Sequence, residues 1–431
     1  MTLARALKHR NYRLFFSGQS VSLIGTWLTR VATAWLVYRL THSALVLGVV
    51  GFASQLPTFF LAPFAGVWVD RWNRHRVLVV TQALAAIQSA LLAGLSLAGV
   101  ITVRDIVILS VFQGLINAVD MPARQSFVVE MVEDRADLPN AIALNSSMFN
   151  GARLIGPSIA GVLIAWVGEG WCFLIDAVSY LAVIASLLAM RVTPRTRASR
   201  PGHVLHDLRE GVRYVTGFVP IRSVLLLLGL VGLFGMPYTV LMPIVAAQVL
   251  HGGPHTLGFL MAAAGLGAFC GALFLASRRT VLGLGRIIAW AAGTFGLGLV
   301  AFSRSHVLWL SLPLLAITGM AMMVQMASSN TILQTIVDED KRGRVMSFYA
   351  MAFFGTAPLG SLFAGSLASK IGAPDTILAG GVACLISAAV FHRHLPALRR
   401  AVRPVYERLG ILPEIARGVD AASQISAPPE D

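Results

Sequence analysis

Charged residues are scarce in this chain. Only 13% of its 431 residues are Asp, Glu, Lys or Arg, whereas a soluble globular domain has about 25%. Hydrophobic residues make up 56% of the sequence, and its mean hydropathy is +0.73. This composition excludes an ordinary soluble domain and is typical of an integral membrane protein.

Lysine and cysteine are also rare, and their positions exclude several kinds of chemistry. The only lysines are Lys8, Lys341 and Lys370, and none follows a glycine, so there is no phosphate-binding Gly-Lys-Ser/Thr loop. The three cysteines have no partner at the spacing of a metal or redox motif. The sequence contains neither a serine nucleophile elbow nor a His-Glu-x-x-His motif. We therefore expect no enzyme activity, no cofactor and no metal.

Twelve apolar blocks occupy most of the chain. Each is near the ~20 residues that an α-helix needs to cross a bilayer. The blocks are long and rich in Leu, Ala and Gly, so they predict transmembrane helices and not barrel strands. They cover roughly residues 14–38, 45–69, 77–99, 105–123, 139–167, 171–190, 221–249, 256–277, 286–303, 307–329, 345–369 and 375–395.

Basic residues are concentrated on one side of the predicted membrane protein. Twelve spans place alternate loops on opposite sides, and Lys and Arg number 28 on the side of both termini and four on the other. Because cytoplasmic loops carry such an excess, both termini are predicted to be cytoplasmic. The net charge of +14 is then explained by anionic lipid at the inner leaflet, and no role with nucleic acid is expected.

An internal repeat divides the chain. The segment "GARLIGPSIAGVLIAWVG" (151–168) and the segment "GTAPLGSLFAGSLASKIG" (355–372) share four glycine positions when one is shifted by 204 residues. They are the fifth and eleventh predicted spans, which indicates two pseudo-symmetric six-helix halves. Such a duplication is typical of transporters whose halves rock about a site at the midplane. The predicted units are a bundle at 1–190, a linker at 191–220 with an amphipathic helix at 203–215, a bundle at 221–396 and a tail at 397–431.

The loop "GVWVDRWNRHRVLVV" (66–80) resembles a signature of the major facilitator superfamily. The pattern G-x-x-x-D-R-x-G-R-x-x-x-L is matched except at its second glycine, which is Asn73 here, another residue that tolerates a left-handed turn. The resemblance implies a conformational latch, in which Asp70 contacts the eleventh span in the outward-facing state. Arg74 would then bridge Asp70 and an acid on the fourth span, for which Asp120 is placed. The latch residues are Gly66, Asp70, Arg71, Arg74 and Asp120; a simple charged turn is the alternative.

Two further resemblances concern transport. Gly151, Gly156, Pro157 and Gly161 follow the Gly-Pro pattern of superfamily antiporters, although close helix packing would also explain them. Residues 11–41 and 120–132 resemble the enterobactin-exporter-like branch, also called transmembrane secretion effectors. This resemblance implies export of a small amphipathic molecule, a siderophore or a drug, across the bacterial inner membrane by proton antiport.

Four ionisable residues fall inside the predicted spans, where charge is expensive and usually functional. These candidates for proton coupling are Asp120, Asp176, Arg30 and Arg153. An Asp–Arg pair that separates and re-forms can take up and release a proton. We prefer Asp120 as the carrier, because it lies on a cavity-side span within predicted reach of Arg74 and Arg153. The alternative is that these residues only hold helices together.

Polar and aromatic residues on the predicted cavity helices are candidates for a substrate site, although ordinary interhelical hydrogen bonding would also explain each one. They are Trp27, Gln113, Asn117, Asn145, Asn150, Tyr238 and Gln325. The expected partners are a small-molecule substrate, protons and membrane lipid, and we expect a monomer. A facilitator or importer of the same fold, for a lysophospholipid or a sugar, is the alternative to an exporter, and a non-transporting membrane sensor is a third possibility.

Overall fold

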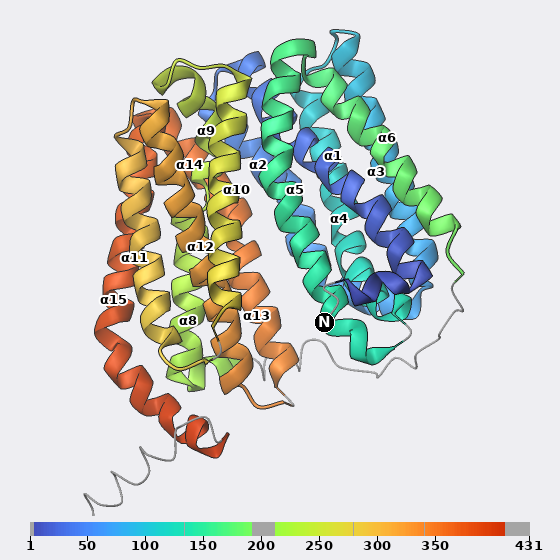
Figure 1. Ribbon diagram of the computed structural model, residues 1–431. Helices are drawn as coiled ribbons and strands as arrows, with labels where there is room; N and C mark the ends of the chain where they lie inside the picture. The colour runs from blue at the N-terminus through green and yellow to red at the C-terminus, as the bar shows by residue number, and fades with distance from the viewer. Residues whose placement is uncertain (1–3, 133, 192–211, 279, 340, 410–431) are drawn as a thin grey trace, which may run out of the picture.

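The computed structural model describes residues 4–132, 134–191, 212–278, 280–339 and 341–409. Within these residues it has 12 candidate membrane spans, all helical. Figure 1 shows them as two bundles, one blue to green and one yellow to red. The predicted all-α membrane protein with two six-helix halves is therefore confirmed.

The spans of the first half are α1 (Arg10–Thr41), α2 (Ala44–Arg71), α3 (Arg74–Leu97), α4 (Val103–Met131), α5 (Leu138–Val167) and α6 (Glu169–Leu188). Short helices η1 (Arg5–Lys8) and η2 (Arg135–Asp137) precede α1 and α5. The second half contains α8 (Val219–Leu230), η3 (Val231–Gly235), α9 (Tyr238–Ile244), η4 (Val245–Val249), α10 (Pro254–Ala276), α11 (Leu284–Ser303), α12 (Leu308–Ile336), α13 (Arg342–Phe354), α14 (Thr356–Ile371) and α15 (Ala373–Arg408).

Two spans that the sequence predicts as continuous are interrupted. The seventh span consists of α8, a π-helical turn at η3, the short α9 and a second π-helical turn at η4. Pro237 follows the first π turn and lacks the N–H that would continue the helix. The eleventh span is divided at Gly355 into α13 and α14. Such π turns occur often at functional sites, and the first one lies just before Tyr238.

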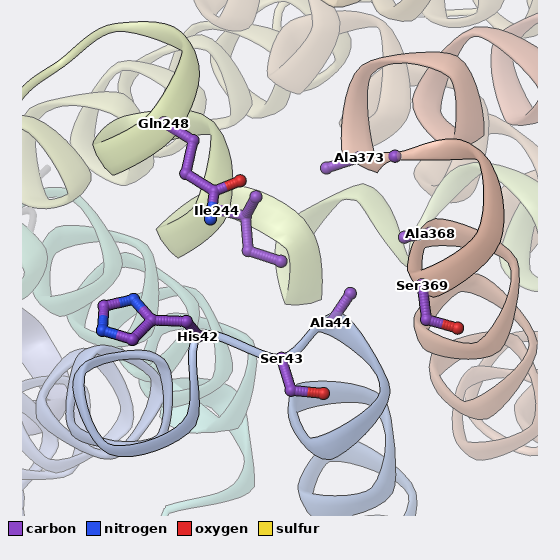
Figure 2. Close-up of a pocket in the computed structure, with 9 residues that line it drawn as sticks. His42, Ser43, Ala44, Ile244, Gln248, Ala368, Ser369 and Ala373 are labelled. Carbon is purple, nitrogen blue, oxygen red and sulfur yellow. The ribbon is translucent and has the colours of Figure 1, made fainter.

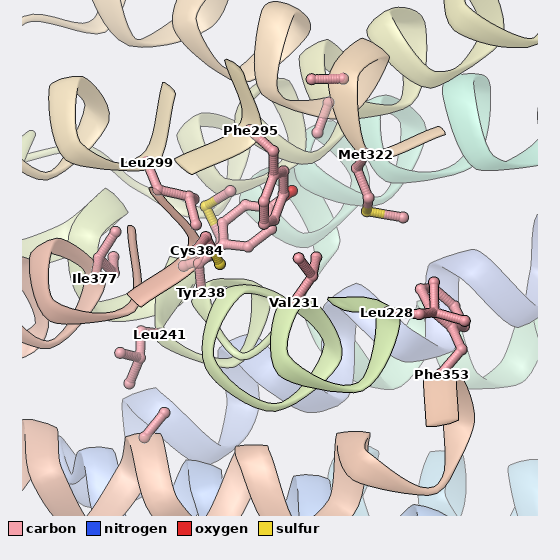
Figure 3. Close-up of a cluster of buried hydrophobic side chains, with 14 of the residues drawn as sticks. Leu228, Val231, Tyr238, Leu241, Phe295, Leu299, Met322, Phe353, Ile377 and Cys384 are labelled. Atoms are coloured by element: carbon pink, nitrogen blue, oxygen red, sulfur yellow. The ribbon is translucent and has the colours of Figure 1, made fainter. Parts of the chain in front are cut away.

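The core of the second half holds the ring of Tyr238. Tyr238 is 3% exposed and packs edge-on against Phe295, with ring centroids 6.3 Å apart. Figure 3 shows this contact among side chains that include Leu241, Met322 and Cys384. Because these neighbours come from several helices, Tyr238 is fixed in place by the packing of the whole half.

The two halves meet in backbone contact through α2 with α14 and through α5 with α10. A Cβ on Gly48 would lie 2.9 Å from the Cα of Gly365, and a Cβ on Gly161 would lie 3.0 Å from the Cα of Gly258. No larger residue fits such an approach without moving the helices. Both contacts lie at the end of the molecule opposite to the N-terminus, where the two bundles converge in Figure 1. We call this end the far end.

The glycines of the internal repeat occupy these contacts. Gly161 and Gly365 are equivalent in the 204-residue shift, and each meets a glycine on the second span of the other half. The repeated glycines therefore form two equivalent contacts between the halves, and they also indicate an internal duplication.

Three helix features differ from the sequence prediction. α4 continues to Met131 and α15 to Arg408, beyond the predicted ends at 123 and 395. Both extensions keep an apolar face, represented by buried Phe127 and Val402, so the helix continues after the apolar block ends. Asp120 consequently lies about three turns from the end of α4, where one turn was expected. Asp176 lies seven residues, about two turns, into α6, whereas the predicted start at 171 placed it five residues from the start.

The predicted amphipathic helix at 203–215 lies mostly outside the described residues. Its last residues, 212–215, are described and are helical.

Substitution of Gly161 by leucine should open the far end. Gly161→Leu adds a side chain at the contact with α10, whereas Gly151→Leu, on the same helix, adds one where a Cβ meets nothing within 4 Å and is the matched control. The readout is labelling of a cysteine at Gln248, in a Cys270→Ser background, by a membrane-impermeant maleimide added to intact cells. We expect several-fold faster labelling in Gly161→Leu than in the control, because overpacked contacts separate. Equal labelling would contradict this role, and labelling only in permeabilised cells would place the far end in the cytoplasm.

Candidate functional site

The loop between α2 and α3 carries the predicted latch. α2 ends at Arg71, and Asn73 caps α3 by accepting a backbone hydrogen bond at 3.1 Å. Asn73 has a φ of −70°, so it replaces the glycine of the pattern as a helix cap and not as a left-handed turn residue. The side chains of Asp70 and Arg71, and the surroundings of Gly66, lie outside the described part of the structure.

Arg74 contacts an acid on α4, but a different one from the acid that was predicted. Its Nη1 donates to Oε1 of Glu130 at 2.5 Å, and the two side chains are 10% and 17% exposed. Asp120 lies ten residues earlier on α4, which is ~15 Å along the helix axis. The pairing of Arg74 with Asp120 is therefore wrong. The cause is the extension of α4, which places Glu130 on a helix where a loop was expected.

Asp120 is held within the first half. It is 3% exposed and accepts hydrogen bonds from Thr81 and Gln82 on α3, both at 2.8 Å. Arg124, one turn further along α4, forms an ion pair with it. Across the described residues no ion pair joins Asp120 to Arg153, so the Asp–Arg pair present at this site is Asp120–Arg124.

Asp176 has a different environment. It is 1% exposed, and its Oδ2 accepts hydrogen bonds from Thr29 on α1 at 2.7 Å and from Ser89 on α3 at 2.8 Å. Ser179 on its own helix is a third hydroxyl neighbour. No cation pairs with Asp176 in the described ranges. It is thus a carboxyl group inside the membrane that joins three helices and is solvated only by hydroxyls.

The two intramembrane arginines lie together. The guanidinium of Arg30 is 4.7 Å from the centre of the Trp27 ring, and the charge of Arg153 on α5 acts on it electrostatically. Tyr238 of the other half is the first residue of α9, which contacts α1. Trp27 packs against Gly156, where an added Cβ would lie 2.5 Å from its Cβ. The structure therefore brings together four predicted residues, Trp27, Arg30, Arg153 and Tyr238, which we call the arginine cluster.

The predicted antiporter pattern on α5 has a packing role. Gly156 receives Trp27, the carbonyl oxygen of Pro157 lies 2.5 Å from where a Cβ of Gly258 would be, and Gly161 contacts α10. A Cβ added to Gly151 would meet nothing within 4 Å. Three of the four residues thus shape the contacts of α5 with α1 and α10.

Four other substrate candidates form hydrogen bonds within their own helix or to a neighbouring helix. On α4, the amide of Gln113 donates to Asn117 at 3.1 Å. On α5, Asn145 accepts from the hydroxyl of Tyr12 at 3.1 Å, and Asn150 donates to a carbonyl of its own helix at 2.8 Å. They do not join the arginine cluster through any hydrogen bond between described residues.

Gln325 on α12 is the exception. It is fully buried, and neither atom of its amide has a hydrogen-bond partner among the described residues. The hydroxyl of Ser328, one turn away, is also unpartnered there. Because a buried amide without partners costs about 1–3 kcal/mol, a ligand or a second conformation that supplies them would be favoured.

A pocket of about 310 Å³ lies between the halves at the far end. Figure 2 shows His42, Ser43 and Ala44 of the first half facing Gln248 and Ser369 of the second. It contains none of the predicted substrate residues, so it is separate from the arginine cluster.

The sequence prediction missed a contact at the N-terminus. Asp137 is 2% exposed and accepts hydrogen bonds from Lys8 at 2.7 Å and His9 at 3.0 Å. These bonds, from Lys8 and then from His9, hold the pKa of Asp137 below its usual value. The hydroxyl of Tyr12 also donates to the carbonyl of Ala141 at 2.8 Å. The segment before α1 is thereby fastened to the start of α5, and only the acid preceding Leu138 could have indicated this.

Comparisons with known sequences agree with this architecture. A model of the family described as "Transmembrane secretion effector" matches residues 2–407. The staphyloferrin A transporter of Staphylococcus aureus is 25% identical over 383 residues, which are 88% of this chain and 95% of the relative. The multidrug efflux pump Tap of Mycolicibacterium fortuitum is 29% identical over 395 residues, with the same two coverages. The enterobactin exporter EntS of Shigella boydii is 24% identical over 402 residues, 93% of this chain and 95% of the relative.

Solved structures share the fold. A bacterial homologue of the human lysosomal transporter Spinster, in an inward-facing and unoccupied conformation, has a TM-score of 0.67 at 14% identity and covers 94% of this chain and 98% of its own. A bacterial homologue of the iron transporter ferroportin, in an inward-facing state, has a TM-score of 0.67 at 14% identity, with coverages of 90% and 98%. At this level of identity the likeness concerns the fold alone.

Substitution of Glu130 should destabilise the first half. Glu130→Gln leaves the guanidinium of Arg74, which is mostly buried, without its charged acceptor on α4. We expect a loss of about 1–3 kcal/mol in the free energy of unfolding. Denaturant unfolding of the purified protein measures the loss, and Glu339→Gln, at an exposed glutamate, is the matched control. A loss no larger than that of the control would show that the contact with Glu130 is not stabilising.

Proposed function

The chain is a major facilitator transporter of the transmembrane secretion effector family, and from this premise we propose that it exports a small amphipathic molecule, siderophore or drug-like, from a bacterial cell by proton antiport. Three relatives that align over most of their length support export, since their names are a staphyloferrin A transporter, a multidrug efflux pump and an enterobactin exporter. The substrates of these relatives differ, so they support the direction and class of transport and not one compound.

We place both termini in the cytoplasm. The excess of Lys and Arg on the side of the termini supports this orientation, since it is the strongest charge signal for membrane topology. The far end then faces outward across the inner membrane. With the glycine contacts made at that end, the conformation described here is closed to the outside.

The main support for the proposal of proton coupling is the environment of Asp176. Its carboxyl group is buried inside the membrane with three hydroxyl neighbours and no cation in the described part of the chain. Intramembrane acids of this kind carry protons in many transporters. Asp120, which the sequence favoured, has its charge balanced by Arg124. We therefore prefer Asp176 as the carrier and keep the Asp120–Arg124 pair as the second candidate.

A latch at the α2–α3 loop would link this chemistry to movement. Arg74 fixes the start of α3 to α4 through Glu130, beside the end of α2. In the present conformation α2 packs extensively against α14, the far-end part of the eleventh span. We propose that the loop engages α13, the other part of that span, when the far end opens. The latch would then have two arrangements, one in each conformation of the transporter.

Transport and coupling can be tested together in inverted membrane vesicles. An acid-inside gradient is generated, and proton release is followed by a pH-sensitive dye after addition of ethidium, staphyloferrin A or enterobactin. We expect at least one compound to release protons in wild-type vesicles. Asp176→Asn should abolish the release while binding of that compound persists, because the neutral amide resembles the protonated acid.

The matched control for this experiment is Asp105→Asn, at a partly exposed acid at the start of α4, which should behave as wild type. If Asp120→Asn abolishes proton release and Asp176→Asn does not, the proton carrier is the Asp120–Arg124 pair. Downhill movement of a compound without proton release would instead indicate a facilitator.

A further inference from the structure

The arginine cluster carries positive charge that no acid neutralises. Within the described residues, neither Arg30 nor Arg153 forms an ion pair or a hydrogen bond with a carboxylate. Asp176 accepts a hydrogen bond from Thr29, the residue that precedes Arg30 in the chain. Successive residues of a helix point ~100° apart, so Asp176 and the Arg30 guanidinium lie on different faces of α1. Two like charges therefore stand beside each other at membrane depth.

Such an arrangement is costly unless something compensates it. Charged side chains inside the membrane normally pair with one another or mark the path of a substrate or ion. Arg30 is an exposed residue although it lies in the middle of α1, twenty residues after the start of the helix at Arg10. Its side chain is thus accessible to a group from outside the protein, and Arg153 stands on the adjoining α5.

The aromatic neighbours leave the hydrogen-bonding edges of the guanidinium free. Arg30 stacks over the Trp27 ring, and Trp27 makes an edge contact with Phe149, with ring centroids 6.3 Å apart. Stacking occupies the face of a guanidinium, while its five N–H donors lie in the plane. A planar oxygen anion can therefore be held by those donors beside an apolar aromatic wall.

We propose that the arginine cluster binds a carboxylate of the transported compound, so that the substrate is an organic acid with an apolar or aromatic part. The carboxylate is held between Arg30 and Arg153, and the apolar part lies against Trp27 and Phe149. Simple cations are disfavoured, because they would be repelled by both arginines. This inference rests on the proposed function only in taking the cluster as part of the transport path.

Three compounds of nearly the same shape test it on the purified full-length protein in nanodiscs. They are salicylate, which is anionic, salicylamide, which is its neutral isostere, and benzamidine, which is cationic. Binding is measured by ligand-observed NMR at equal concentrations. We expect salicylate to bind and to be at least about tenfold tighter than the other two, as hydrogen bonds to charged groups would provide.

Variants then assign the binding to the cluster. Arg30→Gln and Arg153→Gln should each weaken salicylate about tenfold, whereas Arg76→Gln, at an exposed arginine on α3, is the matched loss of charge and should have no effect. Arg30→Lys should retain part of the binding, since the charge remains but the paired donors are lost. Wild-type binding of salicylate in both glutamine variants would overturn the proposal.

The comparison of the three compounds on the wild type needs no variant, so it decides the matter even if a glutamine variant fails to fold. Equal binding of salicylate and salicylamide, or preference for benzamidine, would overturn the proposal while leaving export intact. Conversely, anion binding without proton release in vesicles would leave this inference intact and contradict proton-coupled export.

Discussion

Two glycine pairs, Gly48 with Gly365 and Gly161 with Gly258, allow the two halves to make backbone contact at the far end. The rest of the structure depends on this constraint. It brings α2 against α14 and α5 against α10, and it closes the far end while α1 and α5 hold the arginine cluster beside α9. Small residues at a helix interface allow such close packing inside a membrane. A transporter needs contacts of this kind in one state that are exchanged for others in the next.

Much of the fold could be predicted from the sequence, because the twelve apolar blocks and the 204-residue glycine repeat report membrane crossing and duplication directly. The interruptions of the seventh and eleventh spans could not be predicted in this way. Pro237 marks the seventh span but does not specify π turns on either side of α9, and the break at Gly355 lies where Phe59 of another helix approaches closely. The extension of α4 was missed for another reason: its last residues have an amphipathic pattern, and only the blocks of uniform hydrophobicity were counted.

The candidate site shows the same division. The four ionisable residues predicted inside the spans lie on membrane-spanning helices, because charge in an apolar block is conspicuous, but their partners were not predicted. Asp120 pairs with Arg124 of its own helix, and Arg74 pairs with Glu130. Pairing depends on the direction of side chains around a helix and on where the helix ends, and neither is read reliably from spacing in the chain. As a result, the two acids are separated from the two arginines, which leaves the arginines available to an anion from outside the protein.

The central claim is that the halves exchange contact at the far end for contact at the end near the termini. It can be measured with double electron–electron resonance on spin labels in two pairs of positions, Ser43 with Gln248 at the far end and Ser146 with Ser277 near the termini, in a Cys270→Ser background. Acidification and addition of a transported compound should shift the populations. The account predicts opposite changes, with the far-end distance lengthening as the other shortens. Two distances that lengthen and shorten together, or that stay fixed in protein that transports, would contradict it.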